Sequence, residues 1–165
     1  MNDGEIQGFD FQPDEFYMRA ALRCAHKASA ADEVPVGAVI VCNGEIIARA
    51  WNQVEMLRDA TAHAEMLAIT QAEAATGDKR LNECELYVTK EPCPMCAGAI
   101  VLSRLRRVIF GCHDPKSGAA GGWINLLQSE ALNHRCVVTG GVLGEESGTL
   151  LRQFFGKKRA LADES

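Results

Sequence analysis

The chain has 165 residues, of which 47% are apolar and 24% charged, as in an ordinary globular protein. This length suits one domain with a hydrophobic core and is short for two. It contains no apolar run of about 18 residues, so we expect no membrane-spanning helix. The acidic start, MNDGEIQGFDFQPDE, does not have the pattern of a secretory signal. Seven cysteines, an odd number, then favour free or metal-bound thiols in the reducing cytoplasm.

Charge is unevenly distributed along the chain. The formal net charge is −5, and the first fifteen residues contribute five acids and no base, so the remainder is neutral. Residues 101–160 hold nine basic residues against four acidic ones. A basic C-terminal third permits a polyanionic partner. Solvated helix faces explain the same charges equally well.

The first half of the chain predicts one helix followed by a β-hairpin. Residues 14–31 place apolar side chains at helical spacing, and Asp14 is suited to cap this helix. A buried strand is expected over residues 36–41. Asn43 and Gly44 then form a strong two-residue turn signal that leads into a second strand over residues 45–52.

The second half predicts helices and strands in alternation. A helix is expected to end at Gly77, a favourable C-terminal cap. The expected elements are, in order, a helix over 61–76, a strand over 85–89, a helix over 94–104, a strand over 107–111, a glycine-rich loop over 117–122, a strand over 135–140 and an amphipathic helix over 145–160. Strands separated by single helices indicate an α/β domain with helices packed on a mixed sheet.

Two short segments carry residues suited to chemistry. The segment TKEPCPMCAGAI places Cys93 and Cys96 two residues apart, beside prolines that suit the first turn of a helix. The cysteines alone fit a structural zinc knuckle, a redox pair or part of a catalytic metal site. The segment TAHAEMLAI contributes His63 and Glu65, also near an expected helix start. Helix N-termini favour negative charge and lower thiol pKa values.

The number of ligands separates these alternatives. A structural zinc site is closed by four protein ligands, whereas His63, Cys93 and Cys96 supply three. Three ligands leave a position open for water, as in catalytic zinc sites. Glu65 would then act as a base beside that water. H-x-E with P-C-x-x-C is the known signature of zinc nucleobase deaminases.

The chain resembles the bacterial tRNA-specific adenosine deaminases of the cytidine-deaminase-like superfamily. The resembling segments, in the family's order, are VPVGAVIV, WNQ, DATAHAE, YVTKEPCPMCAGAI, RVIFGCHDPKSGAAG and NHRCVVTGGV. The resemblance covers about residues 16–160. It implies a three-layer α/β/α sandwich with a mixed five-stranded sheet, a homodimer, and one Zn²⁺ per subunit. The chain would then comprise an acidic extension (1–15), a deaminase domain (16–160) and a tail (161–165).

The same resemblance assigns roles to individual residues. His63, Cys93 and Cys96 would hold the zinc, and Glu65 would shuttle protons during hydrolytic deamination of the wobble adenosine to inosine in a tRNA anticodon stem-loop. The residues expected to contact the substrate are Asn52, Ala64, Asp114, Lys116, Ser117, Arg152, Phe154, Phe155 and Lys157. A tight turn would also explain Asp114, Lys116 and Ser117, and packing would also explain the two phenylalanines.

Two departures and two alternatives accompany this interpretation. Lys90 stands where an apolar residue is expected, so it must extend to solvent or find an acid. His113 stands where a cation would suit tRNA better. A free-base or nucleotide deaminase of the guanine or cytosine type would share the zinc motif, but should lack the basic C-terminal helix and the DPKSG loop. A nucleic-acid-binding module that keeps zinc only for stability is a second alternative, which an intact Glu65 disfavours.

Overall fold

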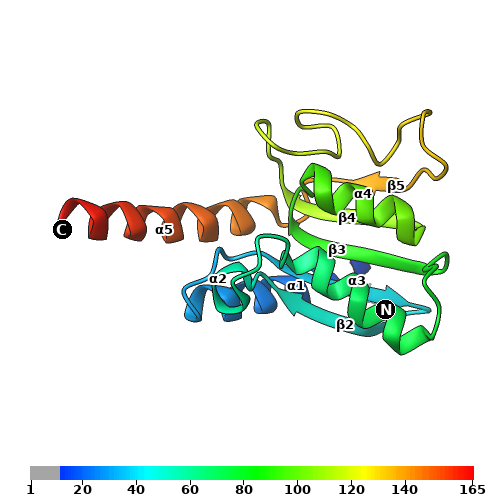
Figure 1. Ribbon diagram of the computed structural model, residues 1–165, viewed down its shortest axis with the longest axis horizontal. Helices are drawn as coiled ribbons and strands as arrows, with labels where there is room; N and C mark the ends of the chain where they lie inside the picture. The colour runs from blue at the N-terminus through cyan, green and yellow to red at the C-terminus, as the bar shows by residue number, and fades with distance from the viewer. Residues whose placement is uncertain (1–11) are drawn as a thin grey trace, which may run out of the picture.

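A mixed sheet of five strands organises the computed structural model, which describes residues 12–165 (Figure 1). The strands are β1 (Gly37–Cys42), β2 (Glu45–Trp51), β3 (Cys84–Lys90), β4 (Arg107–Cys112) and β5 (Val137–Thr139). They lie in the order β2-β1-β3-β4-β5. β1 pairs antiparallel with both β2 and β3, whereas β3, β4 and β5 run parallel. The predicted mixed five-stranded sheet is confirmed. Residues 1–11 of the acidic extension lie outside the described residues.

Helices cover both faces of this sheet and make three layers. The helices are α1 (Pro13–Ala30), α2 (Val54–Leu57), α3 (Ala64–Thr76), α4 (Pro94–Ser103) and α5 (Gly144–Asp163). α3 and α4 pack over one face, and α1 with the start of α5 packs over the other (Figure 1). The α/β/α sandwich expected from the resemblance is therefore present.

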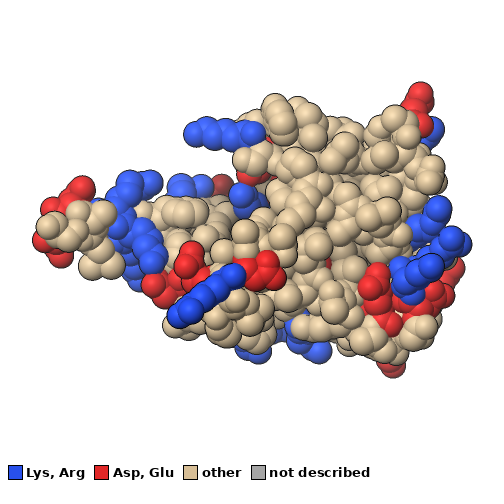
Figure 2. Space-filling model, in the orientation of Figure 1, with Lys and Arg blue, Asp and Glu red and all other residues tan. Residues whose placement is uncertain are grey.

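The last helix leaves the sheet after its first turns. The buried Ser147 packs directly against β4 at Gly111. This close approach is possible because Gly111 has no Cβ atom, which would collide with the Ser147 side chain and the Thr89 carbonyl. The rest of α5 extends past the sheet (Figure 1). Basic side chains gather along this extension (Figure 2). The Lys158 ammonium lies 2.8 Å from an Asp32 carboxylate oxygen and so ties the extension to the end of α1.

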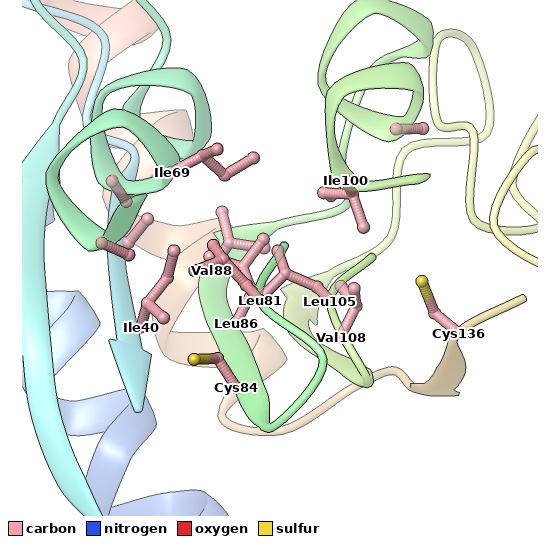
Figure 3. Close-up of a cluster of buried hydrophobic side chains, with 14 of the residues drawn as sticks. Ile40, Ile69, Leu81, Cys84, Leu86, Val88, Ile100, Leu105, Val108 and Cys136 are labelled. Atoms are coloured by element: carbon pink, nitrogen blue, oxygen red, sulfur yellow. The ribbon is translucent and has the colours of Figure 1, made fainter. Parts of the chain in front are cut away.

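The core follows from the alternation of side chains along the central strand. Leu86 and Val88 of β3 point to the face covered by α3 and α4, where they pack with Ile40 in the larger apolar cluster (Figure 3). Tyr87, between them, joins the smaller cluster under α1 with Met18. A strand buried on both faces has this near-continuous apolar sequence because successive side chains point to opposite sides.

Most boundaries lie within one residue of the expected ones, and the larger differences fall at α3, α2, β5 and the end of α5, which continues to Asp163 instead of ending at residue 160. The helix expected over 61–76 begins only at Ala64, because the Asp59 carboxylate accepts a hydrogen bond from the Thr61 amide (2.8 Å) and holds the preceding residues in a turn. α2 was not predicted, since four residues are too few to show a periodic pattern. The fifth strand is shorter than 135–140 and spans Val137–Thr139.

Asp14 does not cap α1 as the sequence suggested. Gln12 is the N-cap residue, and the Asp14 carboxylate binds the Arg107 guanidinium through contacts of 2.9 and 2.7 Å. It also accepts a hydrogen bond from the Tyr87 hydroxyl (3.0 Å). Asp14 therefore joins α1 to β3 and β4. The division into extension, domain and tail stays a prediction, with α1 beginning at Pro13 and α5 ending at Asp163.

Asp14→Asn should lower the free energy of unfolding at pH 7 by about 1–2 kcal/mol, since a charged bidentate hydrogen bond is lost and partial exposure screens it. The hydrogen bond from Arg107 holds the pKa of the Asp14 carboxyl below its usual value of 3.8. The stabilisation is thus full above that usual value and disappears as the pH falls through the lowered folded-state pKa.

Urea unfolding from pH 7 down to about pH 2 measures this effect. The difference between the native protein and the variant should shrink as the pH falls, and a difference that does not depend on pH would contradict the interpretation. Asp163→Asn, at the exposed end of α5, is the matched control and should change stability little.

Candidate active site

Two helices begin at the same edge of the sheet and bring the predicted metal ligands together. β3 ends at Lys90, and the chain then enters α4, whose N-cap residue is Cys93. α3 lies beside α4 on the same face, and its N-cap residue is His63. N-cap positions commonly carry Ser, Thr, Asp or Asn, whose side chains bond the helix amides. His63 and Cys93 make no such cap bond, so their side chains face each other across the two helix starts.

The distances between these side chains fit one small metal ion. The His63 Nδ1 atom lies 3.6 Å from the Cys93 Sγ atom and 3.5 Å from the Cys96 Sγ atom. All three candidate ligand atoms lie within 4.8 Å of one another. Zinc–sulfur bonds of about 2.3 Å and zinc–nitrogen bonds of about 2.0 Å in a tetrahedron separate neighbouring ligands by about 3.5 Å. The residues present therefore fit zinc without rearrangement.

Hydrogen bonds within the cluster shift the pKa values of all three groups. A hydrogen bond with Cys96, assisted by His63, lowers the pKa of the Cys93 thiol to about 4. The same interaction, together with burial, raises the pKa of Cys96. The hydrogen bond to Cys93 raises the pKa of His63, against the opposing effect of burial. Two sulfurs and one imidazole nitrogen at helix N-termini form a donor set typical of zinc.

Glu65 lies beside the cluster and is not part of the candidate ligand group. It occupies the first turn of α3, its side chain is 4% exposed, and burial raises the pKa of its carboxyl group. Glu65 lines a cavity of about 200 Å³ together with His63, Ala64 and Asn52. The structure thus brings these four predicted residues together with Cys93 around one hollow.

Glu33 also lines this cavity and was missed by the sequence reasoning. It is 1% exposed, and its carboxylate accepts hydrogen bonds from the Glu55 amide (3.1 Å) and the Met56 amide (2.6 Å). These bonds hold the first turn of α2 as one wall of the cavity. An acid before the VPV segment gives no local signal of this role, because its partners lie more than twenty residues further along the chain.

Glu91, a second missed carboxylate, organises the glycine-rich loop. It is 3% exposed and accepts hydrogen bonds from the backbone amides of Asp114 (3.0 Å), Ala120 (3.1 Å) and Gly122 (2.8 Å). A Cβ atom at Gly118 or Gly122 would meet the Glu91 carboxylate. Gly118 and Gly122 are therefore required by the close approach of the loop to a buried acid, whereas Gly121 is suited to its positive φ of 117°. The position of Glu91 directly before P-C-x-x-C was the available signal.

The loop residues predicted to contact the substrate form a tight turn in the structure. Asp114 Oδ1 accepts hydrogen bonds from the amides of Lys116 (3.0 Å) and Ser117 (3.1 Å). The other Asp114 oxygen lies 2.9 Å from the Lys90 ammonium, so Lys90 forms an ion pair, which is one of the two outcomes expected for it. The exposed His113 lies with its Nδ1 atom 3.8 Å from Glu91. Contact of Asp114, Lys116 and Ser117 with substrate stays a prediction.

The predicted residues of α5 divide into two groups. Phe154 and Phe155, which pack edge to face, line a groove beside the cavity. The cavity and the groove share the residues Glu33, Val34 and Glu55. Arg152 instead reaches back to the Thr149 hydroxyl (3.0 Å). Lys157 lines a further hollow with Leu161, and this hollow shares Asp32, Phe154 and Lys158 with the groove. Two of the four residues are therefore adjacent to the cavity.

Comparison with known proteins assigns the class. The profile of the MafB19-like deaminase family matches residues 12–159, so the chain belongs to this family. It is 55% identical over 146 residues to a tRNA-specific adenosine deaminase of Bacillus subtilis, covering 88% of this chain and 91% of that one. It is 50% identical over 145 residues to the enzyme of the same name from Aquifex aeolicus, covering 88% and 95%. The resemblance seen in the sequence is confirmed.

Two solved structures share the fold. One, from a study of A-to-I editing by tRNA:A34 deaminases, superposes with a TM-score of 0.80 at 43% identity, covering 82% of this chain and 99% of that one. The other, a guanine deaminase from Nitrosomonas europaea, superposes with a TM-score of 0.73 at 28% identity, covering 85% and 83%. The cytidine-deaminase-like architecture is thus common to deaminases named for different substrates.

Glu91→Gln should destabilise the loop over residues 113–122, since a neutral amide replaces a carboxylate that accepts three backbone hydrogen bonds. We expect a loss of about 2 kcal/mol in the free energy of unfolding. The amides of Ala120 and Gly122 should also exchange faster with deuterium. Native-state hydrogen exchange measures both effects. Glu83→Gln, which changes an exposed acid just before β3, is the control. Unchanged exchange at Ala120 and Gly122 would contradict the role given to Glu91.

Proposed function

We propose that this protein hydrolyses the wobble adenosine of a tRNA anticodon to inosine and releases ammonia. The observation that carries the proposal is the cluster of His63, Cys93 and Cys96 beside the buried Glu65 and a cavity of about 200 Å³. Relatives at 55% and 50% identity that are named tRNA-specific adenosine deaminases support the substrate. Glu65 favours catalysis over nucleic-acid binding alone, because a buried carboxyl group that is not part of the candidate ligand group has no purpose in a zinc site that serves only stability.

One Zn²⁺ per subunit completes the proposal, held by His63, Cys93 and Cys96. Three protein ligands are the number typical of catalytic zinc. Bound zinc supplies a water molecule that is acidic enough to act as a nucleophile at neutral pH. The protein's part is to orient the ligands at two helix N-termini and to keep the cavity small.

Glu65 is the residue proposed to move protons. Its carboxyl group lines the cavity that would hold the base. Hydrolysis at ring carbon 6 requires a proton to leave the attacking water, a proton to reach ring nitrogen 1, and a proton to reach the departing ammonia. One buried carboxyl group can serve all three transfers, because burial raises its pKa and so makes the protonated form easier to reach. Asn52 and Ala64, on the same cavity, are proposed to hold the purine.

The tRNA would reach the cavity along α5 and the glycine-rich loop. The groove lined by Phe154, Phe155 and Lys158 adjoins the cavity, so flanking bases can stack there while the target base enters. Arg152, Lys157, Lys116 and Ser117 are proposed to bind the phosphate backbone nearby. An anticodon loop presents splayed bases, which lowers the free energy needed to expose the target.

A guanine deaminase is the second candidate, because a solved guanine deaminase shares the fold at 28% identity. The extension of α5 with its basic side chains disfavours this alternative, since a free base offers no phosphates for those side chains to bind.

We further propose a homodimer formed through the outer surface of α4. Met95, Gly98, Ala99 and Leu102 recur at helical spacing on this surface, and Leu102 is 82% exposed. Figure 2 shows that the face carrying α3 and α4 is largely free of charged residues. An uncharged, partly apolar face of this kind is typical of a protein interface.

Seven free cysteines and a tRNA substrate favour the cytoplasm as the location of the protein. Among the described helices, none could serve as an apolar span of a lipid bilayer.

A parallel deamination assay tests the function. The zinc-loaded protein should convert adenosine at the wobble position of an anticodon stem-loop to inosine and release no ammonia from free guanine, cytosine or cytidine. Glu65→Gln should retain one zinc per subunit and lose about 10²–10⁴-fold in turnover, which is the usual contribution of general acid–base catalysis. Ammonia from guanine with an untouched stem-loop would support the second candidate. Full activity of the variant would refute the role of Glu65.

Leu102→Glu should convert the proposed dimer to a monomer, because it places a charge in the centre of the apolar surface of α4. Light scattering coupled to size exclusion measures the molar mass. Leu161→Glu is the matched control, since Leu161 is 64% exposed near the C-terminal end of α5. A mass that is unchanged by Leu102→Glu, or a native protein that is already monomeric, would contradict this interface.

A further inference from the structure

Two cysteines outside the metal cluster face each other across neighbouring strands. The antiparallel register of β1 and β3 pairs Cys42 directly with Cys84. Both belong to the face covered by α3 and α4, where Cys84 is part of the larger apolar cluster and Cys42 packs against it. In Figure 3 the Cys84 sulfur points from β3 toward the end of β1. No local pattern connects the two residues, because they lie forty-two positions apart in the sequence.

The register places the two residues at the spacing of a disulfide. Directly opposed residues of an antiparallel pair have Cα atoms about 4.5 or 5.5 Å apart. Disulfides accommodate Cα separations of about 4.4 to 6.8 Å. The side chains also interact: burial, then hydrogen bonding with Cys42, raises the pKa of the Cys84 thiol to about 12. Cys112, the third cysteine in the described strands, has no cysteine opposite it, since it is paired with Lys90.

The two thiols differ in access. Cys84 is 2% exposed, whereas Cys42 is partly exposed and lies immediately before the turn at Asn43 and Gly44. The Tyr17 hydroxyl donates to the Gly44 carbonyl (2.7 Å) and holds this turn in place. Cys42 is thus the thiol that a small oxidant can reach, and Cys84 is the buried thiol placed to react with it.

We propose that Cys42 and Cys84 form a reversible redox pair that closes to a disulfide with low-molecular-weight disulfides such as oxidised glutathione. The Cys42 thiolate attacks one sulfur of the oxidant, forms a mixed disulfide and releases one glutathione. Cys84 gives its proton to solvent and attacks the Cys42 sulfur, which forms the Cys42–Cys84 bond and releases the second glutathione. The protein thiols lose two electrons, and the oxidant gains them.

The location of the pair predicts its effect. Cys84 begins β3 and Lys90 ends it, so the disulfide would form at the opposite end of the strand from the metal cluster. It would join residues that are distant in the chain and restrict the unfolded state. We expect the temperature of thermal unfolding to rise by about 5 °C or more. The activity of the zinc-loaded protein below that temperature should not change.

The test uses the full-length, zinc-loaded protein, in which the metal protects Cys93 and Cys96. Samples equilibrated with oxidised glutathione or with dithiothreitol are digested, and the peptides are mapped by mass spectrometry. The proposal predicts a Cys42–Cys84 cross-linked peptide that dithiothreitol removes, and the rise in unfolding temperature only in the oxidised sample.

Variants separate the pair from general thiol oxidation. Cys42→Ser and Cys84→Ala should each abolish both the cross-link and the rise in unfolding temperature, whereas Cys112→Ser, which changes another partly exposed strand-end thiol, should keep both. Glutathione retained on Cys42 without a cross-link would overturn the proposal. A cross-link that forms between other cysteines with loss of zinc would do the same. These results do not depend on which substrate the enzyme accepts.

Discussion

The packing of α3 beside α4 is the constraint on which the rest of this site depends. Both helices lie on one face of the sheet and begin at the same edge, so two helix N-termini open toward a single point. Each N-terminus carries a partial positive charge and unpaired amide groups, and each therefore favours anionic ligands. His63 and Cys93 stand at the two cap positions without capping them. The proposed metal ligands are thus held by two rigid elements that share one apolar core, and no loop has to close to assemble them.

Buried carboxylates give the cavity its walls. Glu33 and Glu91 are almost completely excluded from water, and both are surrounded by backbone amides that donate hydrogen bonds to them. Hydrogen bonds from several backbone amides to one carboxylate offset much of the free energy that is lost when the carboxylate leaves water. Glu33 thereby positions α2, and Glu91 positions the glycine-rich loop. Glu65 differs, because burial dominates its environment and raises its pKa. The same residue type serves as scaffold in two places and is the proposed proton carrier in the third.

The cysteines of this chain show how position decides chemistry. Cys93 and Cys96 lie at a helix start beside an imidazole, where one thiol ionises easily. Cys42 and Cys84 lie opposite each other on neighbouring strands, where the register brings two thiols together and burial raises the pKa of Cys84. Cys136 is buried in the apolar cluster, and burial alone raises the pKa of its thiol to about 11. The amino-acid type alone distinguishes none of these environments, since each is created by neighbours from other elements.

The amino-acid sequence was sufficient to single out the His63, Cys93 and Cys96 group and to order most of the elements. The spacings of H-x-E and P-C-x-x-C are local, and a helix start converts such local spacing directly into geometry. Alternating apolar strands and helices likewise predicted an α/β domain with helices packed on a mixed sheet, because both periodicities are properties of short segments. Only the tertiary structure decided what depends on residues that are distant in the chain. Glu33 reaches α2, Glu91 reaches the loop near Gly122, Asp14 reaches Arg107, and Cys42 meets Cys84. These contacts exist because the sheet order and the strand register bring distant segments side by side, and no local pattern encodes either one.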